Sequence, residues 1–280
     1  TDMAPATVQR YETSLKHTRD FVWETYHKKD VLLDEVSRQF IEDYEFWLKT
    51  EKKCCHNTAT KYLKNFKKII RIALAKGWMK NDPFLEIRFS LDKVEPDFLE
   101  DSEIQKLISK EIDIPRLSQV RDIFVFCCFT GLAFSDIHGL RKEHIVEDSN
   151  GVRWIRKGRQ KTKIMCNIPL MEIPLKILEK YSTNEYCKKH GVLFPVLCNQ
   201  KMNAYLKELA DICGIKKTLT THVGRHTFAT FALANGVSLE SVAKMLGHTN
   251  VQMTRHYARV LDRTVIREMS QIKMDLHFSM

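Results

Sequence analysis

A break in hydrophobic periodicity between Arg88 and Phe98 most constrains the fold of this chain. Before the break, apolar residues recur at the spacing of an α-helix over residues 5–27, 31–50 and 57–76. The break itself has no period and contains Pro96, which disfavours a regular helix. We therefore place a joint between two domains at this point.

The chain after the break combines helices with a short sheet. Helices are predicted from Glu100 and from about residue 117 to 129, where Thr130-Gly131 ends the second one. Alternating residues between 151 and 170 predict strands joined by a basic turn, and helical spacing returns after about residue 184. The expected fold class is mainly α with a small antiparallel β-sheet. We place a helical domain at residues 1–92 and a larger domain at residues 97–280.

Composition limits the classes of function. The 280 residues suffice for two domains, and no run of 18 apolar residues predicts a membrane span. The N-terminus lacks the apolar core of a signal peptide, so we expect a cytoplasmic protein, and its first residues read like the cut end of a longer chain. The net charge of +10 favours a polyanionic partner; a merely basic soluble protein is the alternative. The eight cysteines form no pair of C-x-x-C motifs, so we expect no metal site.

The predicted helix at residues 57–76 has a basic face. Either Thr58 or Thr60 is expected to cap it. Its apolar side holds Leu63, Phe66, Ile70 and Leu74. The basic face consists of Lys61, Lys64, Lys68 and Arg71. No acid occurs between positions 61 and 80, whereas a solvated helix surface normally mixes signs because like charges one turn apart repel. We therefore predict contact with nucleic-acid phosphates, and a merely solvated face is the alternative.

The C-terminal third contains a pattern suited to phosphate chemistry. His222 and Arg225 lie three positions apart at a predicted helix start, so they share a face beside the partial positive charge of the helix N-terminus. An isolated H-x-x-R is common and more often structural, so this pair alone does not identify a site. The order and spacing of the residues that follow it give it weight.

A second group lies at residues 247–257. Gly247 is predicted to end a helix and to leave His248 exposed at a corner. Either Thr249 or Asn250 then caps a last segment that presents Tyr257. Taken singly, a tyrosine near a helix end is usually a half-buried packing residue. In combination with the H-x-x-R pair, the two groups predict one catalytic constellation.

These motifs resemble those of the tyrosine recombinase, or phage integrase, family, and in particular integrases of Bacteroides-type conjugative or other mobile elements. The resemblance covers most of the chain. It rests on a T-G-L box at residues 130–132, an H-x-x-R box at residues 222–225, an L-G-H box at residues 246–248, a tyrosine nine residues later, and a basic hairpin whose turn lysine is Lys161. Any one box is weak evidence, whereas the combination is specific.

The resemblance implies a reaction without metal, cofactor or ATP. Tyr257 would attack a phosphate of duplex DNA and form a 3′-phosphotyrosine bond, which a 5′-hydroxyl later reverses. Arg225 and His248 would bind the phosphate oxygens, and His222 would act as a general base or a further donor. Lys161 would protonate the leaving 5′-oxygen. The protein is thus expected to be a DNA recombinase or integrase.

One position departs from the family pattern. The residue after T-G-L is normally a catalytic arginine, and here it is Ala133. Arg121, in the helix before the box, is our preferred substitute, and Arg141 is the other candidate. The competing interpretation of Arg121 is a local ion pair with Asp122. By resemblance, Asp136 does not contact the phosphate but holds a side chain of the active site in position.

The family resemblance also implies partners. Two domains would clamp duplex DNA, with Arg159 and Lys163 on the basic hairpin facing the DNA. A homotetramer would act on two duplexes, with an accessory DNA-bending protein as a further possible partner, and the enzyme would lie on the bacterial nucleoid when bound. An apolar stripe at Val265, Met269, Ile272 and Leu276 would dock either on a neighbouring subunit or on its own domain.

Two other functions remain open from the sequence. The first is a recombinase-like protein that binds DNA architecturally and has lost catalysis together with its arginine. The retained nucleophile argues against it, because a pure binding protein does not need one. The second is a type IB topoisomerase, which shares the phosphotyrosine chemistry but would relax any supercoiled plasmid.

Overall fold

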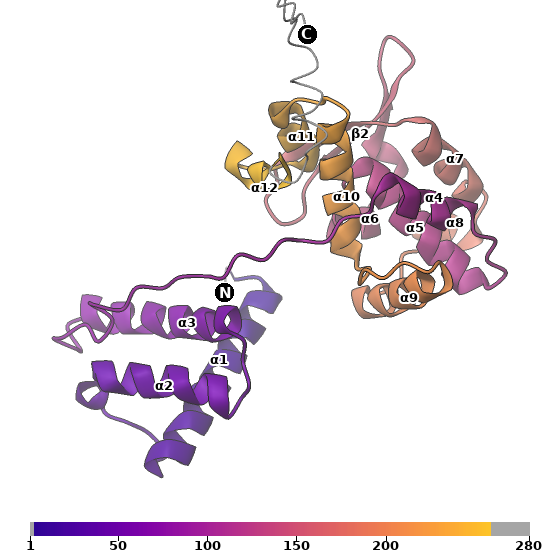
Figure 1. Cartoon of the computed structure of the whole chain (residues 1–280). Helices are drawn as coiled ribbons and strands as arrows, with labels where there is room; N and C mark the ends of the chain where they lie inside the picture. The colour runs from indigo at the N-terminus through magenta and orange to yellow at the C-terminus, as the bar shows by residue number, and fades with distance from the viewer. Residues whose placement is uncertain (1–2, 259–280) are drawn as a thin grey trace, which may run out of the picture. The chain divides into compact units, whose positions relative to one another are not determined.

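A computed structural model describes residues 3–258 of the chain. The chain divides into two compact units, Thr1–Glu95 and Pro96–Met280, each with its own hydrophobic core (Figure 1). This division falls inside the aperiodic stretch at residues 88–98. The apolar stripe predicted between Val265 and Leu276 lies outside the described residues.

Unit 1 is helical and is held together by an aromatic core. Its elements are α1 (Pro5–Tyr26), the 3₁₀ turn η1 (Leu33–Glu35), α2 (Arg38–Thr50) and α3 (His56–Ala75). Phe21 is fully buried, and its ring contacts the rings of Phe40, Tyr44 and Trp47 on α2. Rings of this size bury much apolar surface, so a few of them can hold three helices together.

Two local expectations for unit 1 were wrong. The pattern at residues 31–50 is not one helix, because Ser37 caps α2 by accepting a hydrogen bond from the Phe40 backbone nitrogen at 3.3 Å. In α3, neither Thr58 nor Thr60 is the cap. The helix starts earlier, after Cys55, and both threonines lie within it. The apolar side of α3 is placed as predicted, with Leu63 and Ile70 buried.

Unit 2 combines helices with a three-stranded sheet. The helical elements are α4 (Asp101–Ser109), α5 (Pro115–Thr130), α6 (Phe134–His138), η2 (Lys142–His144), α7 (Glu172–Tyr181), α8 (Glu185–His190), α9 (Asn199–Ile212), α10 (Thr221–Ala234), α11 (Leu239–Leu246), η3 (Val251–Met253) and α12 (Arg255–Ala258). The strands β1 (Ile145–Glu147), β2 (Arg153–Gly158) and β3 (Met165–Pro169) pair antiparallel in chain order. The mainly α fold class with a small antiparallel sheet is confirmed; β1 was not predicted.

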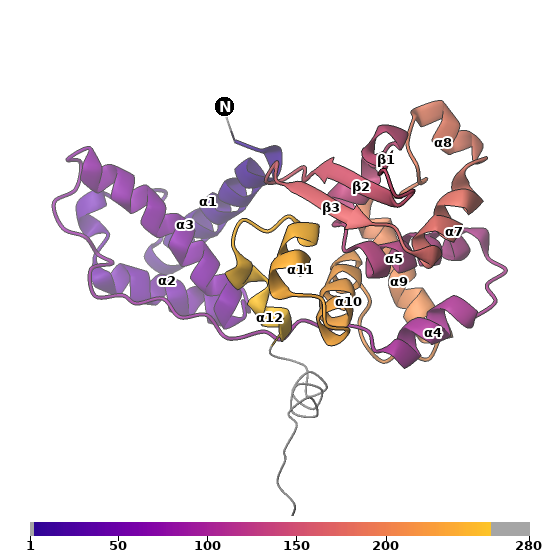
Figure 2. The same ribbon diagram turned by 90° about the horizontal axis from the view of Figure 1, so that it is seen from above.

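Helix α5 forms the centre of unit 2. Buried side chains occur all round it, and they include Cys127 and Cys128. Helix α10 packs along α5 (Figure 2). The approach is close, because a Cβ on Gly224 would lie 3.2 Å from a ring carbon of Phe124. This packing fixes α10, which carries most of the site residues, against the core.

The end of α5 is fixed by a glycine. Gly131 adopts φ 67°, in the left-handed region that favours glycine, and a Cβ there would lie 2.4 Å from a ring carbon of Phe228 on α10. The sequence correctly predicted that α5 ends at Thr130-Gly131. The chain therefore turns sharply and starts α6 directly after Ala133.

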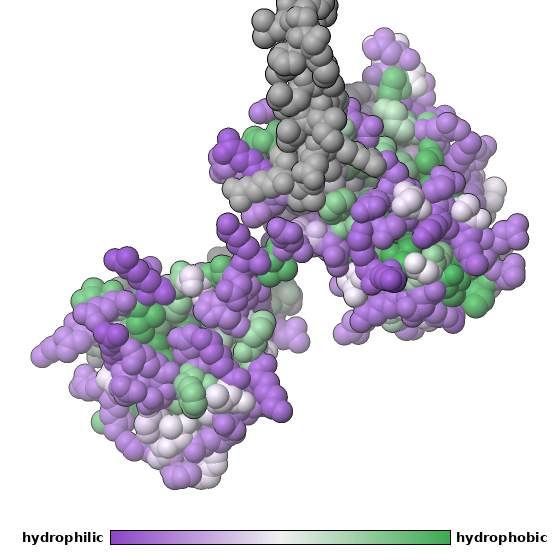
Figure 3. All heavy atoms as spheres, in the orientation of Figure 1, coloured by the Kyte–Doolittle hydropathy of each residue, from purple (hydrophilic) through white to green (hydrophobic). Residues whose placement is uncertain are grey.

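The face of the molecule seen in Figure 3 is mostly polar. In Figure 3, hydrophilic residues cover most of the visible face, and hydrophobic ones form small separate patches. None of the helices in the described part of the chain is long and apolar enough to cross a membrane.

Candidate active site

Arg225 is the most deeply buried cation of the site. It lies one turn into α10 and is 3% exposed. Its two terminal nitrogens donate hydrogen bonds to the carbonyl oxygens of Gly131 at 2.7 Å and Leu246 at 2.6 Å. Burial, and next the charge of Arg159, lower its pKa to about 10, so it stays cationic at neutral pH. The guanidinium is thus held between the ends of α5 and α11.

His222 lies on the same face of α10, one turn before Arg225. The helix start and the shared face agree with the prediction from the H-x-x-R spacing, and the His222 side chain is exposed. Partial desolvation of the ring lowers its pKa, and the charges of Arg225 and Arg159 lower it further. Near neutral pH the imidazole is therefore uncharged and can both donate and accept a hydrogen bond.

His248 follows the end of α11. Gly247 ends the helix with φ 61°, as predicted. His248 itself is half-buried rather than exposed, and its Nδ1 lies 2.8 Å from the hydroxyl of Thr254. Burial, followed by the charges of Arg225 and Arg159, lowers its pKa to about 4. Of the two predicted caps, Asn250 is the one whose side chain accepts a bond from the next turn, from the Gln252 backbone nitrogen at 2.8 Å.

Tyr257 lies on α12 and is 7% exposed. Its hydroxyl is 3.0 Å from Nδ1 of His226 on α10. Burial raises the pKa of the phenol, and the charges of Arg225 and Arg159 oppose that rise. The sequence reasoning missed His226, although it follows Arg225 directly. The available signal was a second histidine four residues, or one helical turn, after His222.

Asp136 connects α6 to the hairpin between β2 and β3. It is 1% exposed, and its two carboxylate oxygens accept hydrogen bonds from the Gln160 backbone nitrogen at 2.9 Å and from Nε of Arg159 at 3.3 Å. Lys161 lies at the tip of this hairpin and is exposed, as is Lys163, whose φ is 61°. The carboxylate therefore fixes one end of the turn that carries both lysines.

Arg159 is the second guanidinium near the cluster. Its side chain is 13% exposed, and its Cδ and Cγ lie 2.7 Å and 3.0 Å from where a Cβ on Gly247 would be. Its charge lowers the pKa of four groups of the site: Arg225, His222, His248 and Tyr257. The sequence placed Arg159 among the DNA-facing bases, and the structure places it against the corner that precedes His248.

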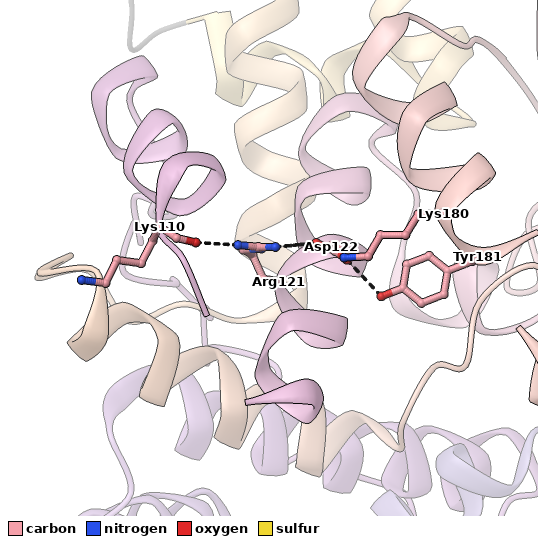
Figure 4. Close-up of polar contacts among 5 residues, drawn as sticks. All are labelled: Lys110, Arg121, Asp122, Lys180 and Tyr181. Carbon is pink, nitrogen blue, oxygen red and sulfur yellow. Dashed lines mark hydrogen bonds and ion pairs between the residues drawn. The ribbon is translucent and has the colours of Figure 1, made fainter. Parts of the chain in front are cut away.

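Arg121 belongs to a different network of contacts from that of Arg225. Its guanidinium donates to the Lys110 carbonyl oxygen at 2.6 Å and pairs with Asp122 at 3.2 Å (Figure 4). Asp122 is in turn held by Lys180 at 2.6 Å and by the hydroxyl of Tyr181 at 3.1 Å. This network joins α5 to the end of α4 and to α7. Within residues 3–258, no contact joins Arg121 to the cluster around Arg225.

The expectation that Arg121 replaces the arginine missing at Ala133 is corrected accordingly. The alternative interpretation, a local ion pair with Asp122, agrees with the contacts that Arg121 makes. The other candidate, Arg141, is exposed at the start of η2. The guanidinium of Arg121 is held at the end of α4 and at Asp122, and no described contact links it to the residues around Arg225.

The basic face of α3 is exposed in unit 1. Lys61, Lys64, Lys68 and Arg71 are all accessible, and none of them forms an ion pair with a described residue. The amine of Lys68 lies 5.5 Å from the ring centroid of Tyr11. Across the described residues, no cluster of three or more His, Cys, Asp or Glu side chains could hold a metal ion.

Both units match known protein families. Residues 97–264 match the phage integrase family, and residues 1–91 match the phage integrase SAM-like domain. A tyrosine recombinase of Pseudothermotoga lettingae is 29% identical over 244 residues, which cover 84% of this chain and 82% of that protein. The tyrosine recombinase XerD of Shewanella oneidensis is 25% identical over 277 residues, which cover 95% of this chain and 89% of the relative.

Solved structures share the fold. A lambda integrase dimer bound to a COC′ core site superposes with a TM-score of 0.74 at 18% identity, covering 91% of this chain and 89% of that chain. The Tn1549 transposon integrase in complex with circular intermediate DNA gives a TM-score of 0.73 at 17% identity, covering 96% and 94% of the two chains. At such identities the likeness establishes the fold, namely a helical unit followed by an α/β unit.

Proposed function

Since the chain belongs to the phage integrase family and is a tyrosine-type site-specific recombinase, we propose that it cuts and rejoins duplex DNA through a 3′-phosphotyrosine bond at Tyr257. The observation that carries the proposal is geometric: the buried Tyr257 hydroxyl lies 3.0 Å from His226 on α10, the helix that also carries His222 and Arg225. Two guanidinium groups, Arg225 and Arg159, act on the pKa of Tyr257, and both also act on His222 and His248. These groups come from α10, the hairpin, the corner after α11, and α12.

The reaction is a balanced exchange of phosphate esters. The oxygen of Tyr257 bonds to phosphorus as the bond from phosphorus to the 5′-oxygen breaks. The phenol loses its proton and the 5′-oxygen gains one. Because one phosphate ester replaces another, the bond energy is retained and no external energy source is needed. A 5′-hydroxyl later reverses the same steps. A buried phenol is a weak nucleophile at neutral pH, and it needs nearby cations to stabilise the charge that develops.

Each cluster residue has a role that suits its environment. Arg225, cationic and fixed by two carbonyl oxygens, can bind a non-bridging phosphate oxygen with its remaining donors. The Nδ1 of His248 faces the Thr254 hydroxyl, which leaves Nε2–H free to donate to another phosphate oxygen. His222, uncharged and exposed, can accept the phenol proton. Lys161, at the accessible hairpin tip, is our proposed acid for the leaving 5′-oxygen.

Arg159 is our proposed substitute for the arginine missing at Ala133. Three observations support it: its burial, its link to Asp136, and its effect on four groups of the cluster. A guanidinium presents several donors in a fixed plane that suits a phosphate. Asp136, which would repel a phosphate directly, acts here by holding Arg159 and the Gln160 backbone.

Duplex DNA is the partner. We propose that the basic face of α3 binds its phosphates, together with Lys163 on the hairpin. We also propose a homotetramer acting on two duplexes, assisted by a DNA-bending protein, as is usual for enzymes that exchange strands between two sites. The DNA substrate would place the enzyme on the nucleoid in the bacterial cytoplasm.

A covalent-trapping assay tests the proposal. Nicked duplexes made from the DNA that flanks the gene are incubated with the protein in EDTA and resolved on a denaturing gel. We expect a covalent band with the wild type and none with Tyr257→Phe, while DNA binding is equal in both. Tyr186→Phe, which changes an exposed tyrosine of the same unit, is the matched control and should keep the band.

Three results would contradict the proposal. A band that persists in Tyr257→Phe would exclude this residue as the nucleophile. Tight binding without any band would indicate a protein that binds DNA without cutting it. Relaxation of arbitrary supercoiled plasmids would indicate a topoisomerase.

A further inference from the structure

We propose that His226 is a positioning residue for the nucleophile: its uncharged ring accepts the hydrogen bond of the Tyr257 hydroxyl and fixes the direction of the phenol. The inference deepens the proposed function and rests on Tyr257 being the nucleophile. None of the family boxes that identified the site includes this residue.

The contact is short and enclosed. The Tyr257 hydroxyl oxygen lies 3.0 Å from Nδ1 of His226, and the two ring centroids are 5.3 Å apart. His226 is 9% exposed and Tyr257 is 7% exposed. Tyr257 also belongs to a small apolar cluster with residues of α10 and α11, including Phe228 and Leu246. A hydrogen bond inside such a cluster is favoured over one to water, because a buried polar group without a partner is costly.

The charge state of His226 determines which atom donates. Burial, followed by the neighbours His222 and Arg225, lowers its pKa to about 4. The His222 ring lies edge-on at 4.3 Å between centroids. A neutral imidazole has one donor and one acceptor nitrogen. Since a phenol is the natural donor of the pair, Nδ1 accepts and the ring proton is on Nε2.

His226 is poorly suited to take the phenol proton. The transfer would create a second cation beside Arg225 in a buried site, and the lowered pKa of His226 measures how unfavourable that is. Burial meanwhile raises the pKa of Tyr257. The hydrogen bond therefore orients the hydroxyl without ionising it, and the proton leaves by another group. An orienting contact matters because a displacement of about 1 Å can cost about 100-fold in rate.

Two variants separate positioning from a structural role. His226→Leu removes the acceptor and keeps an apolar side chain of moderate size, whereas His226→Asn retains an acceptor oxygen near the position of Nδ1. Single-turnover formation of the covalent band is measured on nicked duplex, with DNA affinity and thermal midpoint measured in parallel. We expect His226→Leu to slow the covalent step about 10- to 100-fold with unchanged DNA affinity, and His226→Asn to recover most of the rate.

Other outcomes of the same measurements would overturn the positioning role of His226. If His226→Asn is as slow as His226→Leu, or if the rates follow the thermal midpoints, the residue is structural and the proposal fails. If His226→Leu cleaves as fast as the wild type or faster, the contact does not assist the nucleophile and the proposal fails as well.

A measurement independent of activity tests the contact itself. Long-range ¹H–¹⁵N spectra of the full chain should show the Nε2–H tautomer of His226. Tyr257→Phe should then shift the Nδ1 signal while that of the exposed His138 stays constant. An Nδ1–H tautomer, or no shift, would overturn the positioning role alone. A wild-type protein that shows this contact but forms no covalent band would overturn the proposed function, and this role with it.

Discussion

Ala133 precedes α6 directly, and three residues later Asp136 determines where the guanidinium of Arg159 lies. A short methyl side chain at position 133 leaves the start of this helix without a cation. We propose that Arg159, on the hairpin that follows in the chain, supplies this cation. Asp136 holds the hairpin in place by accepting hydrogen bonds from both Arg159 and the Gln160 backbone. Which residue supplies the positive charge thus depends on tertiary contacts. The position of a motif in the sequence does not reveal these contacts.

Arg159→Ala should therefore reduce the covalent step much more than DNA binding. Loss of one preorganised donor typically costs about 10²–10³ in rate. Arg159→Lys should recover only part of this, because an ammonium lacks the planar fork. Single-turnover rates and affinities on the nicked duplex are the measurements. Arg156→Ala, an exposed position on the same hairpin, and Arg121→Ala are the matched controls. A loss with Arg121→Ala equal to that with Arg159→Ala would reject this assignment.

Stability should fall on mild acidification because of His226 and His248. Their folded-state pKa values are lowered to about 4, mainly by burial, against an ordinary value of about 6.5. Between these values only the unfolded chain binds the proton, so stability is complete above about pH 6.5 and is lost as the pH falls towards 4. Each histidine contributes a slope of at most about 1.4 kcal/mol per pH unit.

Urea midpoints measured between pH 5.0 and 7.0 test this dependence. His248→Gln should flatten the slope relative to the wild type. His138→Gln, which changes an exposed histidine of the same unit, should leave it unchanged. Equal slopes for all three proteins would contradict the assignment of His248 as a buried neutral group.

At the scale of elements, turns and glycines were predicted better than caps and short strands. Gly131 and Gly247 end α5 and α11 as expected, because the left-handed conformation that ends a helix strongly favours one residue type. The cap of α3 was misplaced, because the helix begins after Cys55, whose side chain makes no capping hydrogen bond, so none of the residue types that usually mark a helix start stands there. Strand β1 was missed, since three residues carry too little alternation to be recognised and Glu147 at its end is exposed.

For the site, too, the sequence predicted local features better than contacts between distant elements. The sequence could single out His222, Arg225, His248 and Tyr257 as candidates because each lies at a fixed interval from another along the chain. The partner of Arg121 was left open, because an adjacent Asp122 and a distant phosphate are equally consistent with the sequence. His226 was missed because its importance depends on which way the Tyr257 hydroxyl points. Contacts between elements far apart in sequence cannot be derived from periodicity.

Gly131 packs against the core and its carbonyl holds Arg225, the proposed phosphate-binding cation, so Gly131→Ala should lower both stability and activity. A Cβ at φ 67° costs about 1–2 kcal/mol, and the 2.4 Å approach to Phe228 adds about 1–3 kcal/mol of overpacking. Because the Gly131 carbonyl also holds Arg225, the covalent step should slow as well. Gly151→Ala is the matched control: its φ is 75° and nothing lies within 4 Å of the added Cβ. Urea midpoints that fall equally for both variants would exclude a contribution from packing.

At the scale of the whole molecule, the net charge of +10 is distributed unevenly, and the basic face of α3 is one concentration of it. Replacing its four bases with glutamine should weaken binding to any duplex to a similar extent, because phosphate contacts carry no sequence information. Each lost contact should reduce the slope of log affinity against log salt by about 0.9, so the total change should be about 3–4. Affinities at several salt concentrations, measured on the flanking DNA and on an unrelated duplex, provide the test.

The control for this experiment must change the net charge equally without touching α3. Glutamine replacements at four other exposed bases of unit 1 meet this requirement: Lys28, Lys29, Arg38 and Lys49. If the effect came from net charge alone, both sets would change the salt slope by the same amount. If the basic face of α3 contacts phosphates, only its own replacements will reduce the slope, since a charge lying more than a Debye length of about 8 Å from the DNA is largely screened at physiological salt. At saturating protein the α3 variant should still form the Tyr257-dependent covalent band, because the residues proposed for catalysis, all in unit 2, are unchanged.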